Sequence, residues 1–358
     1  MKIINEPQTI SLAEYNDQIE KYKNRVSSIG GVQSVYLMGS IKAPGLSDVD
    51  LIVVVDDDFK SSLSGELSVS GLDPRIFLHG PVVVPISLSK RLQEIVYASN
   101  LSCIYGYDCL QRWEDVGGDV KKYLSVCYLI DFLESRFLQS ASIKDFPVDK
   151  RSWLTRIWST THSVFLYESL TNEEIPLNYK KIMTDVKLTR EKWLSEGRVD
   201  DGDFLSGLIA SENINEFIFN NVLDLFYGGA TLKSDFHLSS GAKIFRFINS
   251  VESPVYNYRS IKFLEKKFSV YDCVHGPKYL AHLAGYFPLD IDWDKPPYFN
   301  EKLEKVKKQR SEAITSHSLW LNKHVPQSKS MKGYLGIDRV NDETVRGHVK
   351  KIIAWLIT

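Results

Sequence analysis

The segment between residues 35 and 58 constrains the fold of this chain more than any other part of the sequence. A strand-like run, Val35–Met38, ends at Gly39-Ser40, and a second apolar run contains two acids, Asp48 and Asp50, near its start. Runs rich in β-branched and aromatic residues, bounded by Gly, Pro and Ser, are typical of strands. We therefore expect two strands joined by a short loop.

The two acids of this segment are expected to lie on the same side of their strand. Side chains alternate faces along a strand, so Asp48 and Asp50 point one way while Val49 and Leu51 face the core. At about 3.3 Å of rise per residue, the two Cα atoms lie roughly 6.6 Å apart. Two carboxylates at this spacing can converge on one divalent cation, so Asp48 and Asp50 are the candidate metal ligands.

The loop before the acids has the composition of a phosphate-binding turn. Gly39 permits close approach of the backbone, and Ser40 adds a hydroxyl beside backbone N–H groups. Pro44-Gly45 breaks any continuing helix and returns the chain to Ser47 and the acidic strand. A triphosphate held at Gly39-Ser40 would meet Mg²⁺ at the acids, since Mg²⁺ prefers one or two carboxylates together with substrate phosphates.

Gly-Ser, seven further residues and then Asp-x-Asp on an apolar strand resembles the signature of the nucleotidyltransferase superfamily, which includes the polymerase-β-like enzymes. The resemblance covers about 25 residues in detail. It implies that Gly39 and Ser40 contact the nucleotide phosphates, that Asp48 and Asp50 hold metal ions and act catalytically, and that Ser47 is a weaker phosphate contact. It also implies a third carboxylate on a following antiparallel strand.

That third carboxylate is not assigned by the sequence. The next strand-like segments are Arg75–Leu78 and Pro81–Leu88, and the second contains no acid. Asp73 precedes the first segment, but Asp73-Pro74 also opens an ordinary turn, which is the favoured interpretation. The acids at 56–58 are typical of a solvated turn after a buried strand, and His79 is a possible proton acceptor in this neighbourhood.

Helical periodicity dominates much of the remaining sequence. We expect one helix to begin at Ser11, with Glu14 in the capping-box position, and a second helix at residues 89–100. Four longer helices are expected at 119–142, 150–170, 171–196 and 203–227, followed by helices near 298–324 and 342–356. Short strands at 243–248 and 270–274 are also possible. The aromatic residues of the four helices are interpreted as core, because they recur at helical spacing.

The predicted fold class is therefore α+β, with a small mixed sheet followed by a mainly helical C-terminal region. The expected domains are a nucleotidyltransferase-like unit at 1–115, a helical bundle at 116–235 and a mainly helical region of unclear type at 236–358. A length of 358 residues suits two or three domains.

Bulk properties restrict the partners and the compartment. The net charge is −1, which gives no argument for nucleic-acid binding, although Lys and Arg outnumber Asp and Glu by twelve to six from Glu301 onward. The four cysteines show no zinc-ligand spacing, and neither a signal peptide nor a membrane span is expected. These features favour a cytoplasmic protein with free thiols and no membrane partner.

The leading functional hypothesis is a Mg²⁺-dependent nucleotidyltransferase. It would move a nucleoside monophosphate from an NTP, with ATP as the expected substrate, to a hydroxyl or amine acceptor and release pyrophosphate. The alternative is a catalytically impaired member of the same fold that binds a nucleotide or a partner protein. The acid-free Pro81–Leu88 run motivates that alternative. A nucleic-acid polymerase or tRNA-modifying enzyme is disfavoured by the charge balance.

Overall fold

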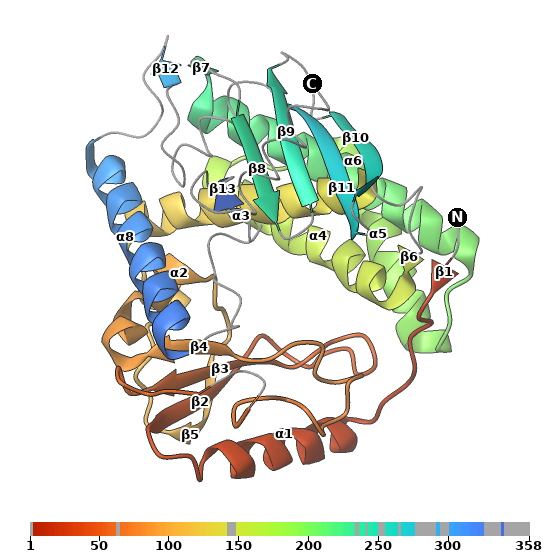
Figure 1. Ribbon diagram of the computed structural model, residues 1–358. Helices are drawn as coiled ribbons and strands as arrows, with labels where there is room; N and C mark the ends of the chain where they lie inside the picture. Colours follow the sequence, from red (N-terminus) through yellow and green to blue (C-terminus); the bar gives the residue numbers. More distant parts are fainter. Residues whose placement is uncertain are drawn as a thin grey trace.

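A computed structural model describes residues 3–61, 65–141, 148–232, 236–240, 243–249, 255–263, 266–275, 291–293, 301–325 and 338–339. The protein belongs to the mixed α+β class, as the sequence predicted. In Figure 1, a four-stranded sheet with helix α1 on its outer side lies below, and a group of long helices lies above.

The strands and helices of the N-terminal unit are β2 (Val32–Met38), β3 (Asp50–Val55), β4 (Val82–Pro85), β5 (Ser102–Gly106), α1 (Leu12–Val26) and α2 (Leu92–Ile95). The sheet order is β4-β3-β2-β5, with β2 antiparallel to both β3 and β5. Strand β4 is parallel to β3. The central strand β3 is buried from Leu51 to Val55, so its two faces pack into two separate hydrophobic clusters.

Helix α1 covers one face of this sheet. Its apolar residues Tyr15, Ile19, Tyr22 and Val26 are buried in one cluster with alternate residues of β2 and β3. The Glu14 N–H donates to the Ser11 hydroxyl, and the Ser11 N–H donates to the Glu14 carboxylate at 2.8 Å. The predicted capping box is thus confirmed.

Two expectations for residues 75–100 are wrong. Residues 75–78 form a turn, because the Asp73 side chain accepts from the Arg75 N–H and the Asp73 carbonyl accepts from two later N–H groups. The second segment contains only the short strand β4, followed by a 3-10 helix at Ile86–Arg91 and the single-turn helix α2. The expected helix at 89–100 is therefore much shorter than predicted.

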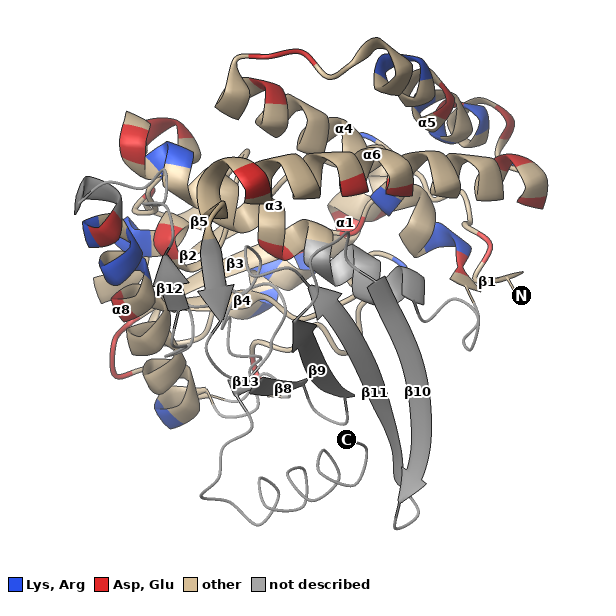
Figure 2. Ribbon diagram, turned by 90° about the horizontal axis from the view of Figure 1, so that it is seen from above, with Lys and Arg blue, Asp and Glu red and all other residues tan. Residues whose placement is uncertain are grey.

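The four long helices are confirmed with small changes in their bounds. They are α3 (Gly118–Ala141), α4 (Lys150–Thr171), α5 (Leu177–Glu196) and α6 (Asp201–Tyr227). One hydrophobic cluster joins them, with Trp153, Leu154 and Phe204 among its buried members. The expectation that the aromatic residues at helical spacing form core is confirmed for Trp153 and Phe204 but is wrong for Phe165 of α4, which is 67% exposed. Figure 2 shows Lys and Arg beside Asp and Glu on α5 and on α8 (Glu301–His324).

Helix α8 returns to the N-terminal unit and completes it, which the domain boundaries of 1–115 and 236–358 did not anticipate. In Figure 1 it runs from the level of the upper helices down to α2 and the sheet. His317 Nε2 lies 2.8 Å from the Val83 carbonyl of β4, and Leu321 and Val325 join the α1-side cluster. Residues about 200 positions apart thus share one core.

The C-terminal region is not mainly helical in its described parts. Strands β8 (Phe236–Ser240), β9 (Lys243–Asn249), β10 (Val255–Phe263), β11 (Lys266–His275) and β13 (Asp338–Arg339) form a five-stranded sheet of order β10-β11-β9-β8-β13. The possible strands at 243–248 and 270–274 lie within β9 and β11, which pair in parallel. The expected helix at 342–356 lies outside the described residues.

Short two- and three-residue pairs complete the described secondary structure. They are β1 (Ile3–Ile4) with β6 (Val148–Asp149) and β7 (Ala230–Leu232) with β12 (Ile291–Trp293). A single 3-10 turn lies at Trp113–Asp115. Among the helices that the structure describes, none combines the length and apolarity needed to cross a bilayer.

Leu321→Ala is expected to lower the free energy of unfolding by about 2–5 kcal/mol, because it opens a cavity between α8 and the sheet. Leu319→Ala, two residues earlier on the same helix, is the matched control. Leu321 is 2% exposed and Leu319 is 65% exposed. Urea unfolding measures both, and equal midpoints for the two variants would contradict the packing of α8 on this core.

Candidate metal centre

The loop between β2 and β3 brings the Gly-Ser bend and the two acids to one edge of the sheet. Met38, the last residue of β2, is directly opposite Asp50, the first residue of β3. Gly39, which begins the bend, directly follows Met38 and therefore lies next to Asp50 on the neighbouring strand. The antiparallel register, which is a tertiary feature, places the predicted phosphate turn beside the predicted metal ligands.

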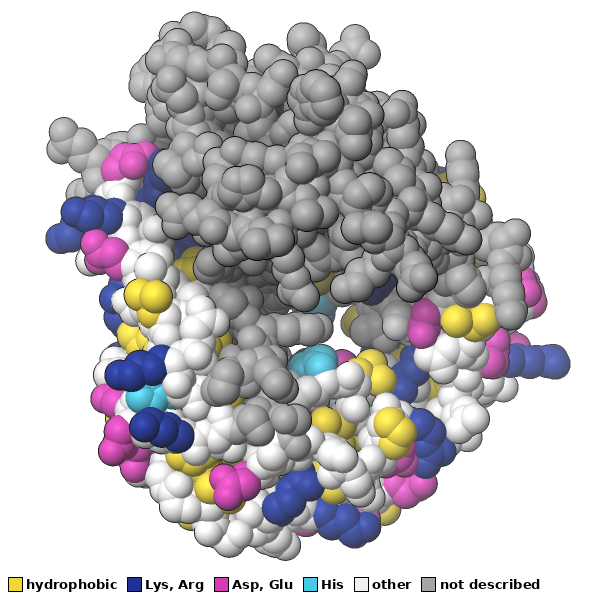
Figure 3. Space-filling view, viewed as in Figure 1, with side chains coloured by type: hydrophobic (Ala, Val, Ile, Leu, Met, Phe, Trp, Pro, Cys, Tyr) yellow, Lys and Arg dark blue, Asp and Glu magenta, His cyan; other side chains and the backbone are white. Residues whose placement is uncertain are grey.

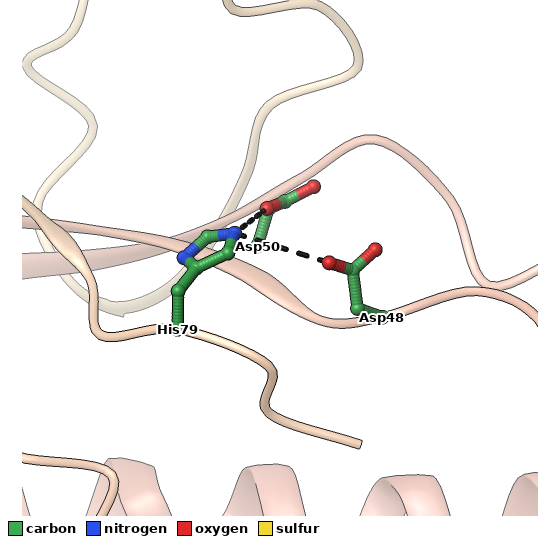
Figure 4. Close-up of side chains that lie close together, drawn as sticks. All are labelled: Asp48, Asp50 and His79. Atoms are coloured by element: carbon green, nitrogen blue, oxygen red, sulfur yellow. Dashed lines mark ion pairs between the residues drawn. The ribbon is translucent and has the colours of Figure 1, made fainter. Parts of the chain in front are cut away.

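Asp48 and Asp50 project to the same side, as alternation predicts. Val49 and Leu51 are 3% and 2% exposed and lie in the core, whereas the Asp48 and Asp50 side chains retain 26% and 32% exposure. One ligand atom from each acid and one from His79 all lie within 4.8 Å of one another. Figure 4 shows the imidazole directed at both carboxylates.

His79 reaches the acids because β4 is parallel to β3. In this pairing Val82 is opposite Ile52, so the residues just before β4 lie at the same edge as those at the start of β3. His79 Nε2 lies 2.8 Å from Asp50 Oδ1 and 3.9 Å from Asp48 Oδ2. The sequence suggested His79 as a neighbouring proton acceptor, but no pattern in it revealed the parallel register that makes it a member of the cluster.

The electrostatics of the cluster are those of three ionisable groups held close together. A hydrogen bond to Asp50 is the main factor that raises the pKa of His79 to about 9. Burial, and then the negative charge of Asp50, raise the pKa of Asp48, while His79 and Arg151 oppose that change. The site thus holds an acid that resists ionisation and an imidazole that retains its proton, which is the expected response to two converging carboxylates.

The carbonyl groups that precede Asp48 are held by side chains from two distant helices. The Tyr15 hydroxyl of α1 donates to the Ser47 carbonyl at 2.5 Å and accepts from the Gly45 N–H at 3.0 Å. Arg151 of α4 is 6% exposed and donates to the carbonyls of Leu46 and Ser47 at 3.3 and 3.1 Å. These contacts fix the backbone from which Asp48 projects.

Arg151→Met is expected to lower the free energy of unfolding by about 2 kcal/mol, because it removes charge-assisted hydrogen bonds and keeps most of the apolar stem. The loss stays moderate because Tyr15 still donates to Ser47 and the Thr155 hydroxyl to Leu46. The exposed Arg198→Met is the control, with an expected change within about 0.5 kcal/mol. Identical urea midpoints for the two variants would show that Arg151 does not stabilise this loop.

The bend at Gly39-Ser40 offers fewer free donors than the sequence suggested. The Gly39 N–H donates to the Ser99 carbonyl at 3.0 Å, so it is already satisfied within the fold. Gly39 has φ +80°, and a Cβ built there meets no atom within 4 Å, so the space beside its Cα is open. Ser40 is exposed, while Ser47 is only half-exposed and its N–H already donates to the Ala43 carbonyl at 2.8 Å. Ser40 is therefore the more accessible phosphate contact.

The other acids weighed as a third carboxylate lie in other contacts. Asp73 forms an ion pair with Arg75 at 2.6 Å, in agreement with the turn interpretation. Asp56 accepts from the Gln33 amide at 2.7 Å, and Asp57 accepts from the Ser87 N–H at 3.1 Å. Within the described part of the chain, the third group beside Asp48 and Asp50 is an imidazole rather than a carboxylate.

The donor set fits a divalent cation. Two carboxylates that repel one another, with an imidazole nitrogen in the same small volume, are the ligand types of Mg²⁺, Mn²⁺ and Zn²⁺ sites. All three side chains keep partial exposure, so a substrate group has access to the same edge. In the space-filling view, a histidine side chain with an acidic side chain beside it is visible near the middle of the face shown (Figure 3).

No model of a known protein family matches this chain, and no curated protein matches it.

Proposed function

We propose that the chain is a metal-dependent nucleotidyltransferase, which moves a nucleoside monophosphate from an NTP to a hydroxyl or amine acceptor and releases pyrophosphate. Its N-terminal sheet would then be a nucleotidyltransferase domain. The observation that supports this most directly is the register of β2 and β3, which puts the Gly-Ser bend beside two convergent acids. Phosphate and its cation would thereby meet at one edge of the sheet.

Each group of this edge has a distinct task in the proposed reaction. Asp48 and Asp50 would hold the cation, which when bound neutralises phosphate charge and lowers the pKa of the attacking hydroxyl. The Ser40 hydroxyl would orient the phosphates, and the open space beside Gly39 lets them approach the backbone. Tyr15 and Arg151 keep the loop in place, so that positioning contributes to the rate.

Pyrophosphate release is the direct test. The purified protein is incubated with ATP, CTP, GTP or UTP and Mg²⁺ or Mn²⁺ in the presence of a cell extract or a panel of alcohols and amines. We expect pyrophosphate and a nucleoside monophosphate adduct, detected by mass spectrometry, with ATP preferred. Equal pyrophosphate release by Asp50→Asn would contradict the assignment.

A catalytically impaired binding module of the same fold is the second candidate. The observation that favours it is that, within the described residues, the two acids are joined by His79, which forms an ion pair with Asp50, and by no third carboxylate. Such a module would bind a nucleotide in calorimetry, with a dependence on divalent cations, and release no pyrophosphate with any acceptor. Turnover in the preceding assay would exclude it.

A further inference from the structure

We propose that His79 is a third protein ligand of the cation held by Asp48 and Asp50, so that the site favours a first-row ion such as Mn²⁺ over Mg²⁺. This inference rests on the proposed cation site of the two acids. It adds a ligand that the nucleotidyltransferase resemblance does not supply, because that resemblance implies a carboxylate at the third position.

The separations within the cluster suit a shared ion. Ligand atoms that sit about 2.1 Å from one metal are at most about 4.2 Å apart, when they lie on opposite sides of it. His79 Nε2 is 2.8 Å from Asp50 and 3.9 Å from Asp48, and all three ligand atoms lie within 4.8 Å. The 4.8 Å limit exceeds that maximum by only about 0.6 Å, so small side-chain movements are enough to bring the three atoms to one ion.

The second ring nitrogen of His79 provides an independent argument. Nδ1 lies 2.9 Å from the Gly80 carbonyl, which can only accept a hydrogen bond. Nδ1 therefore carries a hydrogen, and the second proton of the charged ring lies on Nε2, which faces Asp50 at 2.8 Å. A cation that displaces this second proton to solvent meets an Nε2 lone pair directed at the carboxylates. A ligating histidine ordinarily donates its other N–H to a carbonyl or carboxylate, which fixes both the tautomer and the ring orientation.

The backbone that presents His79 is fixed by the fold. Gly80 lies two residues before β4, which pairs with β3 from Val82 onward. Helix α8 contacts the same strand, since His317 Nε2 lies 2.8 Å from the Val83 carbonyl of β4. The imidazole itself is 48% exposed, so the site stays open to a substrate. Its three ligands are the first residue of β3, Asp50, and two residues from the segments that lead into β3 and β4, Asp48 and His79.

The mixed ligand set determines the expected metal preference. Carboxylates alone suit hard ions such as Mg²⁺, whereas imidazole favours first-row ions with greater affinity for nitrogen. Mg²⁺ also loses its water reluctantly and is seldom bound by dedicated protein ligands alone. Replacement of the nitrogen by a carboxylate should therefore shift the preference toward Mg²⁺.

Direct binding of Mn²⁺, without any nucleotide, tests the inference. Electron paramagnetic resonance gives the affinity, and electron spin-echo envelope modulation reports nitrogen bound to Mn²⁺. We expect nitrogen modulation in the wild type and none in His79→Ala, with Mn²⁺ affinity lowered at least about tenfold. His79→Glu, whose carboxylate reaches about as far as Nε2 does, should restore binding without nitrogen modulation and lower the Mn²⁺ to Mg²⁺ preference. The exposed His162→Ala is the matched control, with wild-type affinity and modulation, and circular dichroism checks each fold.

Two negative results have different meanings. If Mn²⁺ binds with an affinity that depends on Asp50, but without nitrogen modulation and equally well in His79→Ala, the role of His79 is refuted and the proposed function stands. If neither Asp48→Asn nor Asp50→Asn weakens Mn²⁺ binding, the cation site itself is refuted, and the proposed function fails with it.

Discussion

Asp48→Asn and Asp50→Asn are each expected to lower the rate of nucleotide transfer by about 10³-fold or more, while the protein remains folded. Each change keeps the shape of the side chain and removes one of the two negative charges that would hold the cation. A bound ion contributes several kcal/mol of charge stabilisation in the transition state, and each 1.36 kcal/mol corresponds to a factor of ten in rate. Asparagine is a neutral and weaker ligand for the same ion.

The stability of Asp48→Asn should be equal to or higher than that of the wild type at neutral pH. Because burial and the charge of Asp50 raise the Asp48 pKa, the folded protein holds this proton more tightly than the unfolded chain does. Above the ordinary carboxyl pKa, ionised Asp48 therefore lowers the free energy of unfolding, and this penalty is absent below about pH 4. The stability advantage of the variant should disappear over the same range.

Pyrophosphate release and calorimetric melting, the latter in EDTA at pH 4 and at pH 7.5, together check this prediction. Asp58→Asn is the matched control, because Asp58 is an exposed acid of the same segment beyond the end of β3. It should retain wild-type turnover and melting temperature. Loss of turnover accompanied by an equally large loss of stability in Asp48→Asn would indicate a structural rather than a functional role.

Gly45→Ala is expected to destabilise the protein by more than about 3 kcal/mol and to abolish cation binding at the acids. Gly45 has φ +91°, and an added Cβ would lie 2.3 Å from the Gln8 carbonyl oxygen and 2.9 Å from the Trp193 ring. The backbone at Gly45 must therefore move. Its N–H donates to the Tyr15 hydroxyl that also binds the Ser47 carbonyl, so the movement is transmitted to the residue before Asp48.

Substitutions of two other glycines distinguish the backbone strain from the steric clash that Gly45→Ala would introduce. Gly71 has φ +81° with no atom within 4 Å of an added Cβ, so Gly71→Ala should cost only the backbone strain of about 1 kcal/mol. Gly30 has neither a positive φ nor a close neighbour, and Gly30→Ala should be neutral or slightly stabilising. Urea unfolding ranks the three variants, and a Gly45→Ala cost no larger than that of Gly71→Ala would contradict the predicted steric clash.

Local sequence patterns predicted the structure correctly where the conformation of a segment depends only on neighbouring residues. The capping box at Ser11 and Glu14 and the four long helices were predicted correctly, because helical periodicity and end signals act within a few residues. The alternation of Asp48 and Asp50 with Val49 and Leu51 followed from strand geometry for the same reason. Their chemical roles stay predictions.

Prediction from sequence failed where a partner distant in the chain determines the structure. The strand expected at 75–78 is a turn because the Asp73 side chain caps it. The C-terminal region contains a sheet in which β11 pairs with β9 and β13 pairs with β8, strands that are not adjacent in the chain. Helix α8 also belongs to the N-terminal core, although it follows the sheet by about 200 residues. The local amino-acid sequence of a segment does not predict its contacts with distant segments.

At the candidate site, the sequence by itself determined that two acids face one way behind a Gly-Ser bend, because a strand alternates its side chains whatever surrounds it. Which other groups lie beside the two acids was determined only by the tertiary structure. The antiparallel register set the bend beside Asp50, the parallel register of β4 added His79, and helices α1 and α4 fixed the loop through Tyr15 and Arg151. Strand register depends on pairing between segments far apart in sequence, so it exists only once the chain has folded.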